Sequence, residues 1–454
     1  MIKIITKILN WANIDRATFF SVLSRVWGIV SGPITLAIIG ARFTDVEQGY
    51  YMAFLSVIGY SMYIQFGLGR VIIQFASHEW AKLKLDDTGR VVGDSEALSK
   101  LSSLAKFAMK WFIVGAIIVI IGLSIGGYIF FSTSKQPAIP IIWQSQWLIL
   151  ALFVGLNLIF YPLYYLLEGC GQVYYIYQFR FWRGLIGNIS IWSAIYLGAG
   201  LWTYSVFFLV GFPIILYFIV YKHRNLFRSL IFNKISGKSF NWIREILPMQ
   251  WQLTVISLCA YFMFQIFTQG SMYARGPARA GKTAMTWNMI LMLGMIMGAF
   301  IAPKMPGFGN LIAQKKYQEF DKIFFKVLVI GLSALIIGSI VLISGVAVLN
   351  YVPVEIFEYY SNRMLPLLPT VIFVIAYILW VFITQLGLYF IAHKKTPHWW
   401  IIVSSAFFAT LSTWYFGGKY GLTGAGIGLI VVFLAHFPVM LWMWRKCRRE
   451  WHSY

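Results

Sequence analysis

The sequence predicts an all-α integral membrane protein with about twelve transmembrane helices. Of its 454 residues, 59% are hydrophobic and only 11% are charged, whereas soluble domains carry about 25% charged residues. The mean hydropathy is +0.73. The apolar runs are continuous and about twenty residues long, which suits membrane-spanning helices; a membrane β-barrel would show alternating segments of about ten residues.

Twelve apolar runs are separated by short polar segments, and each run predicts one span. We expect them at residues 17–41, 48–75, 107–131, 145–168, 175–198, 201–221, 246–270, 281–303, 326–349, 366–391, 398–416 and 421–444. Residues 1–15 form a short amphipathic segment without a small-residue cleavage site. We therefore expect the first span to act as the insertion signal and to be retained.

The distribution of positive charge orients the spans. With both termini in the cytoplasm, 27 of the 37 Lys and Arg residues fall in cytoplasmic segments and seven fall in outer segments. This bias is the positive-inside pattern of membrane proteins. The net charge of +22 therefore indicates insertion and contact with anionic membrane lipid, and we expect no nucleic-acid partner.

The order of spans and loops predicts two related halves. Gly49 and Gly281 each open a span that precedes a charged cytoplasmic segment, and they lie 232 positions apart, about half the chain. We expect an N-terminal six-helix bundle (1–222), a cytoplasmic linker (223–245) and a C-terminal six-helix bundle (246–454). An even number of spans per half gives pseudo-twofold symmetry about an axis along the membrane normal.

The loops argue against an enzyme. The longest outer loops that we expect, 132–144, 271–280 and 350–365, are short and hold few carboxylates, and no nucleotide-binding G-x-x-x-x-G-K-[ST] sequence occurs. Three isolated cysteines, Cys170, Cys259 and Cys447, have no metal-site spacing, so we expect neither a metal site nor a bound cofactor.

Cationic residues expected inside or beside the membrane are the candidate substrate-binding groups. Arg25 and Arg70 fall within spans one and two, where a charge costs several kcal/mol unless it has a role or reaches the headgroups. Arg183 begins span five, where it or Arg180 has Glu168 as an alternative, structural partner. Snorkelling to the headgroups is the competing interpretation for the two span arginines.

A second cationic group lies between spans seven and eight on the outer side. Arg275, Arg279 and Lys282 break the positive-inside pattern there, which an anionic partner or a lipid headgroup would explain. Three uncharged polar residues, Gln65, Gln250 and Asn288, are candidates to line a cavity, although contacts between helices are their default role. Together, these features indicate a transporter of an anionic, amphipathic substrate.

Several segments resemble Wzx-type polysaccharide flippases. The resemblance rests on EGCGQV at 168–173 with Tyr177 and Arg180, LPMQW at 247–251, Gly276-Pro277 with Ala280-Gly281, and PKMPGFGNLIA at 303–313. With the span layout it covers essentially the whole chain, but no single motif is diagnostic. Wzx-type flippases are similar to the superfamily of multidrug, oligosaccharidyl-lipid and polysaccharide exporters, which includes the lipid II flippase and the MATE antiporters.

The resemblance implies a MATE- and MurJ-like fold in a bacterial inner membrane. It further implies alternating-access movement of an undecaprenyl-diphosphate-linked oligosaccharide to the periplasmic leaflet. A polysaccharide polymerase and a chain-length regulator would be its partners in O-antigen or lipopolysaccharide biosynthesis. Asp15 precedes span one, so that span lacks the acidic residue of a MATE-like pattern, and coupling to H⁺ or Na⁺ stays open.

Two alternatives remain. A MATE-like drug or metabolite antiporter would need carboxylates near mid-bilayer, but Glu168 and Glu245 lie near span ends. An O-antigen polymerase or acyltransferase would need a large outer loop that carries its catalytic residues, which the charge map excludes unless a span is misplaced.

Overall fold

The computed structural model describes residues 16–65, 68–232, 247–301, 304, 308, 311–312, 314–393 and 395–452. It confirms the all-α, multi-pass membrane fold class. In the described ranges, seven helical stretches are long and apolar enough to cross a membrane. The chain divides into two compact units, Met1–Trp251 and Gln252–Tyr454, which are treated separately below. The division into six-helix bundles at 223–245 stays a prediction.

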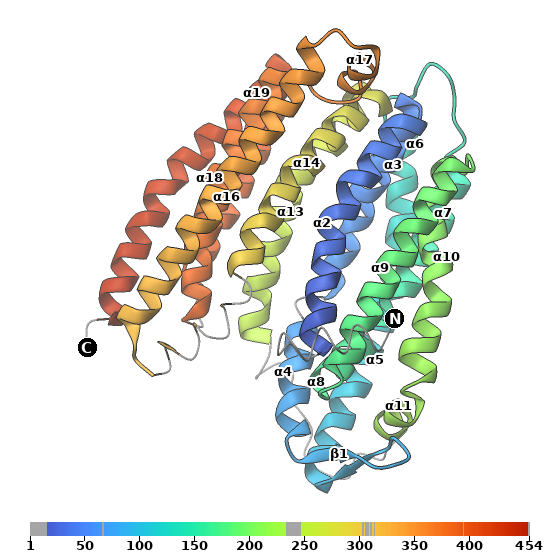
Figure 1. Cartoon of the computed structure of the whole chain (residues 1–454), viewed down its shortest axis with the longest axis vertical. Helices are drawn as coiled ribbons and strands as arrows, with labels where there is room; N and C mark the ends of the chain where they lie inside the picture. The colour runs from blue at the N-terminus through green and yellow to red at the C-terminus, as the bar shows by residue number, and fades with distance from the viewer. Residues whose placement is uncertain are drawn as a thin grey trace. The chain divides into compact units, whose positions relative to one another are not determined.

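Unit 1 is a helical bundle in which α2 packs along α9, α4 along α8, and α5 along α7 (Figure 1). Its helices are α2 (Arg16–Arg42), α3 (Asp45–Ile58), η1 (Gly59–Gln65), α4 (Leu68–Trp80), α5 (Ser95–Gly122), η2 (Leu123–Gly127), α6 (Tyr128–Thr133), α7 (Gln144–Leu158), α8 (Tyr161–Gly169), α9 (Val173–Tyr196), η3 (Gly200–Trp202), α10 (Thr203–Ile215), η4 (Leu216–Tyr221) and α11 (Arg224–Ile231).

The span expected at 48–75 is broken rather than continuous. A capping box starts α3, in which the Thr44 hydroxyl accepts from the Glu47 amide (3.2 Å) and the Glu47 carboxylate accepts from the Thr44 amide (2.9 Å). The helix then tightens into the 3₁₀ turn η1 before α4 begins. Gly69 in α4 lets the Tyr165 ring approach, since a Cβ there would lie 2.5 Å from Tyr165 Cζ.

A β-hairpin follows α4, in a segment for which the sequence predicted only charged loop. Its strands, β1 (Leu83–Leu85) and β2 (Val91–Gly93), are antiparallel. In the turn, Asp86 accepts hydrogen bonds from the Thr88 hydroxyl (2.7 Å) and from the Arg90 amide (2.8 Å), which hold the pKa of Asp86 below its ordinary value. The Val91 amide donates to the Ser229 hydroxyl of α11 (3.1 Å), so the hairpin is anchored to this end of unit 1.

Unit 2 is a second helical bundle around an aromatic core that includes Phe264, Trp287, Phe373 and Trp380. The helices of this part of the chain are α13 (Leu247–Arg275), α14 (Pro277–Ile301), α16 (Tyr317–Tyr351), α17 (Glu355–Ser361), α18 (Leu367–Ala392) and α19 (Trp399–His452). Helix α18 packs along α19 and α16, and α14 packs along α16 (Figure 1).

Two predicted connections of unit 2 differ from the structure. The outer loop expected at 271–280 is wrong, because α13 and α14 are separated only by Gly276, whose φ of +86° makes a tight corner. The two spans expected at 398–416 and 421–444 run on without a loop in α19. They meet at Gly421, whose φ of +68° is not helical.

Candidate functional site

Among the described charged residues of unit 1, Arg183 is unusual because it lies in the interior of helix α9. Arg183 is ten residues beyond Val173, where α9 begins, and a rise of about 1.5 Å per residue puts it about 15 Å along the helix. The whole helix has 24 residues, so Arg183 lies near its middle. The sequence predicts Arg183 at the beginning of span five, whereas the structure places it further in, near the middle of α9.

The partners of Arg183 are neutral. Its Nη2 donates to Asn157 Oδ1 (2.9 Å), and its guanidinium lies 5.4 Å from the centre of the Phe207 ring. Asn157 Nδ2 in turn donates to the Tyr161 hydroxyl (3.3 Å). Among the described residues, no carboxylate forms an ion pair with Arg183, and its buried Nε has no hydrogen-bond partner.

Electrostatics make such a site selective for anions. A guanidinium in the interior of a membrane helix costs several kcal/mol, and an amide and an aromatic ring offset only part of that cost. Its planar donors match phosphate or carboxylate oxygens, with which they form charge-assisted hydrogen bonds. The arrangement can therefore hold an anionic group at the depth of the middle of α9.

Tyrosines of α8 extend the polar surface beside Arg183. Tyr161 and Tyr164 have ring centres 5.7 Å apart, and the Tyr164 hydroxyl is buried without a hydrogen-bond partner in the described part of the chain. Tyr165, the next residue, donates from its hydroxyl to Gln65 Oε1 (2.5 Å). Gln65, which ends η1 and is predicted to line a cavity, thus contacts this tyrosine-bearing face of α8.

Arg180, one turn before Arg183, is neutralised. Its Nη2 lies 2.6 Å from Glu168 Oε2, at the end of α8. Of the two pairs with Glu168 that the sequence left open, the structure forms the one with Arg180. The Glu168 carboxylate at the end of α8 is therefore paired with Arg180, while Arg183 contacts Asn157.

The other predicted site residues are distributed as follows. The side chains of Arg25, Arg70 and Gln250 lie outside the described residues, so their roles stay predictions. In unit 2, Arg275 ends α13 beside Gly421, where a Cβ would lie 3.5 Å from its guanidinium nitrogens. Arg279 is exposed and Lys282 is half-buried, both in the first turns of α14.

Asn288 lies in α14, where its Nδ2 donates to the Ala284 carbonyl of the preceding turn (2.8 Å). It therefore bonds at least in part to its own helix, as intramembrane amides commonly do. Arg275, Arg279 and Lys282 thus lie at or beside the corner between α13 and α14, Asn288 lies about three turns further along α14, and the role of all four in binding stays a prediction.

The sequence analysis missed the groups that surround Arg183. Asn157 lies in the middle of an otherwise apolar run near the end of α7 and is four residues before Tyr161, the first residue of α8. That spacing, followed at once by Pro162 and further tyrosines, was a usable signal. The sequence alone did not show that α9 would bring Arg183 to the same place.

Comparison with known proteins identifies the fold. No protein-family model matches the sequence, and no curated protein matches it. Among solved structures, the MATE multidrug transporter DinF-BH, solved as a complex, is similar with a TM-score of 0.62 and 13% identity, over 97% of this chain and 96% of that one. The lipid II flippase MurJ, in an inward closed conformation, is similar with a TM-score of 0.53 and 14% identity, over 94% of this chain and 87% of that one.

A third similar structure is a transporter of the MOP superfamily from Pyrococcus furiosus, described as having a binding pocket of reverse polarity. Its TM-score is 0.51 at 9% identity, over 96% of this chain and 95% of that one. At these low identities the likeness establishes the fold alone. The chain therefore has the fold shared by MATE transporters and MurJ.

Proposed function

We propose that the protein is a flippase that moves an undecaprenyl-diphosphate-linked oligosaccharide from the cytoplasmic to the periplasmic leaflet by alternating access. In this proposal it lies in a bacterial inner membrane with both termini in the cytoplasm. The observation that carries the proposal is Arg183, an arginine near the middle of α9, the helix of predicted span five, whose partners among the described residues are neutral. A diphosphate is an anion that such a group would bind.

The surroundings of Arg183 suit the remainder of this substrate. The Tyr161 and Tyr164 rings, whose centres are 5.7 Å apart, place two phenol hydroxyls among the groups near Arg183, and a sugar next to the diphosphate could hydrogen-bond to them if the helices separate during transport. Gly211 of α10 faces Arg183, since a Cβ there would lie 3.5 Å from the Arg183 Nε, so no side chain of that residue covers the guanidinium. The polyprenyl tail is hydrophobic, so it would remain among the lipid acyl chains and would not contact these polar groups.

The same fold gives a second candidate, a drug or metabolite antiporter. It is favoured by the likeness to the multidrug transporter DinF-BH. A cationic drug would require a carboxylate near mid-membrane, yet all 15 Asp and Glu residues of the sequence lie near the ends of the expected spans or outside them. We therefore rank the anionic cargo first. Coupling to H⁺ or Na⁺ and association with a polymerase and a chain-length regulator stay predictions.

Transport by purified protein in proteoliposomes tests the proposal. The probe is a fluorescently labelled prenyl-diphosphate sugar, and a membrane-impermeant quencher reports how much of it has crossed. We expect Arg183→Gln to lower the rate at least about tenfold, because loss of one charge-assisted contact to phosphate costs about 1.5–3 kcal/mol. Arg183→Lys should restore part of the rate, since it keeps the charge but loses the planar fork.

Arg180→Gln is the matched control, because it removes the same charge one turn away on the same helix. A wild-type rate in the Arg183→Gln variant, or an equal loss in both variants, would contradict the role of Arg183. Efflux of a lipophilic cationic dye in the same vesicles, without movement of the prenyl-diphosphate probe, would favour the antiporter. The same assay tests the predicted roles of Arg25 and Arg70 with Arg25→Ala and Arg70→Ala.

A further inference from the structure

A large, open cavity lies at one end of unit 2, at the start of α16 and the end of α19. Its volume is about 1050 Å³, and the charge map predicts that it faces the cytoplasm. Five cationic side chains line it, two from the chain before α16 and three from the last turns of α19: Lys315, Lys316, Arg445, Arg448 and Arg449. These two groups are more than 120 positions apart in sequence. The tertiary fold therefore brings the cationic residues together, rather than a single stretch of consecutive basic residues.

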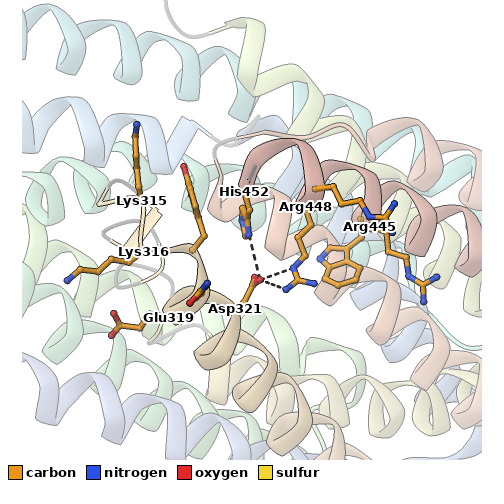
Figure 2. A pocket seen from close by; sticks show the side chains of 11 residues that line it. Lys315, Lys316, Glu319, Asp321, Arg445, Arg448 and His452 are labelled. Atoms are coloured by element: carbon orange, nitrogen blue, oxygen red, sulfur yellow. Dashed lines mark hydrogen bonds and ion pairs between the residues drawn. The ribbon is translucent and has the colours of Figure 1, made fainter. Parts of the chain in front are cut away.

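The acidic residues of the cavity leave a cationic excess. Asp321 is buried and engaged, because both Nε and Nη2 of Arg448 lie 2.7 Å from its Oδ2, and the Tyr389 hydroxyl donates to its Oδ1 (2.8 Å). His452 Nδ1 lies 3.6 Å from the same Oδ2. Figure 2 shows Asp321 between Arg448 and His452, with Lys315 and Lys316 on the other side. Glu319 is the second carboxylate of the lining, and Lys315, Lys316 and Arg445 are three further cations of the lining besides Arg448.

The backbone adds positive potential to the same cavity. Helix α16 begins at Tyr317, and its N-cap residue, Lys316, makes no side-chain cap hydrogen bond. The first turn of a 35-residue helix carries amide groups without helical partners and the positive end of the helix dipole, which favour an anion. Cationic side chains and a helix N-terminus combine here, as they do where proteins bind phosphate groups.

The two helices that end at the cavity expose apolar side chains further along their length. Trp444 and Arg445 mark the point where the apolar run of α19 gives way to charged residues. Before that point, Val431 and Leu434 are 61% and 51% exposed, and on α16 Val329 is 62% exposed. Apolar side chains that are exposed on membrane helices face the acyl chains. A lipid whose headgroup entered the cavity could therefore extend its acyl chains along these helices.

From these observations we infer that the cavity binds the phosphate headgroup of an anionic membrane lipid. Asp321 acts as a positioning residue that holds Arg448 and His452 at one wall of the cavity, and Lys315, Lys316 and Arg445 supply the charge for the phosphate. The inference does not depend on the cargo of the proposed flippase. The phosphate belongs either to a bilayer phospholipid or to a prenyl-diphosphate lipid, and the experiment separates the two.

Native mass spectrometry of the full-length protein in detergent measures lipid binding directly. The probes are phosphatidylglycerol, a prenyl diphosphate, phosphatidylcholine and inorganic pyrophosphate. We expect one of the two anionic lipids to bind more tightly than phosphatidylcholine and pyrophosphate, and the tighter of the two identifies the source of the phosphate. The variant Arg445→Gln should weaken that binding by at least about tenfold, because a charge-assisted contact to the phosphate is removed.

Lys446→Gln is the matched control. Lys446 lies in the same turn of α19 but pairs with Glu450 (4.0 Å) and does not line the cavity. The second variant, Lys315→Gln/Lys316→Gln, alters the opposite wall and should also weaken binding if the first fails to fold. Equal effects of the control and the cavity variants, equal binding of phosphatidylcholine, or binding of pyrophosphate as tight as that of the lipids would overturn the inference.

Discussion

At the scale of single residues, the arginines of this chain differ by what neutralises them. Arg180 and Arg448 each contact a carboxylate, at 2.6 Å and 2.7 Å. Arg183 lies in a helix interior and contacts an amide at 2.9 Å. An arginine that is paired with a carboxylate has little affinity for a further anion, because its charge is already neutralised. An arginine with neutral partners keeps its affinity for an anion. This difference, rather than the number of cations, singles out Arg183.

A buried histidine makes stability depend on pH. His223, just before α11, is 8% exposed, and its ring lies edge-on to the Tyr175 ring with the centres 5.0 Å apart. Burial, with a smaller contribution from the charge of Lys222, lowers the pKa of His223 to about 4, from an ordinary value of 6.5. Between these two values the unfolded chain binds a proton that the folded chain does not. The free energy of unfolding therefore falls as the pH drops from about 6.5 to about 4, by about 3 kcal/mol in total.

Thermal unfolding in detergent at pH 7.5 and pH 5.0 checks this prediction. The wild-type midpoint should fall on acidification, and the fall should be smaller in His223→Gln, which has no proton to gain. His78→Gln is the control, since the His78 side chain is 79% exposed. If His223→Gln loses as much stability between the two pH values as the wild type, the stability effect lies elsewhere.

At the scale of elements, the helices of unit 1 pack closely where glycines remove side chains. At Gly169, which ends α8, a Cβ would lie 2.5 Å from the Ala76 Cβ and 2.9 Å from the Ile73 carbonyl of α4. Because one of these neighbours is backbone, the contact cannot be relieved by a change of rotamer. Helix α8 carries Tyr165, so this contact with α4 also holds the tyrosine face beside Arg183 in place.

We expect Gly169→Ala to lower the free energy of unfolding by about 1–3 kcal/mol, because the added methyl group forces α4 and α8 apart. Gly122→Ala is the matched control. Gly122 is exposed near the end of α5, nothing lies within 4 Å of its Cβ position, and alanine there should be neutral or stabilising by up to about 1 kcal/mol. Chemical unfolding of the two variants in the same detergent measures both. Equal stabilities would show that α4 and α8 can separate without cost.

At the scale of the whole molecule, orientation in the membrane is the property that charge predicts and that labelling can test. In unit 1 the helical stretch Ser95–Thr133 has 39 residues, about 58 Å at 1.5 Å per residue, which exceeds the hydrocarbon thickness of about 30 Å. It separates the β-hairpin, whose turn includes Thr88, from the segment with Ile139 (Figure 1). These two segments should therefore face opposite sides of the membrane.

We expect a cysteine at Ile139 to react with a membrane-impermeant maleimide in intact spheroplasts, and one at Thr88 to react only after permeabilisation. Both positions are exposed, and the background would lack the native Cys170, Cys259 and Cys447. The reason is the positive-inside bias, which puts the hairpin in the cytoplasm and residue 139 in an outer loop. The reverse pattern would refute the predicted orientation, including the cytoplasmic termini.

The sequence by itself determined the fold class, because continuous apolar runs of span length have few stable alternatives in a bilayer. It also located most helices to within several residues, from Arg16–Arg42 to Leu367–Ala392. It predicted wrongly where the backbone changes direction locally, as at Gly276, or where polar segments pair, as in the hairpin Leu83–Gly93. Those choices depend on φ angles and on hydrogen bonds to other elements, which hydropathy does not encode.

Only the tertiary structure decided which charges meet which partners. The sequence placed Glu168 near both Arg180 and Arg183 without choosing between them, and it gave no reason to connect Asp321 with Arg448, 127 positions later. Which charged residues form a pair depends on distances of a few ångströms between neighbouring helices. Composition and periodicity report only the average environment along one helix. The proposed anion-binding site at Arg183 in unit 1 and the proposed lipid-binding cavity in unit 2 therefore depend on how the helices pack. The fold in which they lie is predicted by the sequence alone.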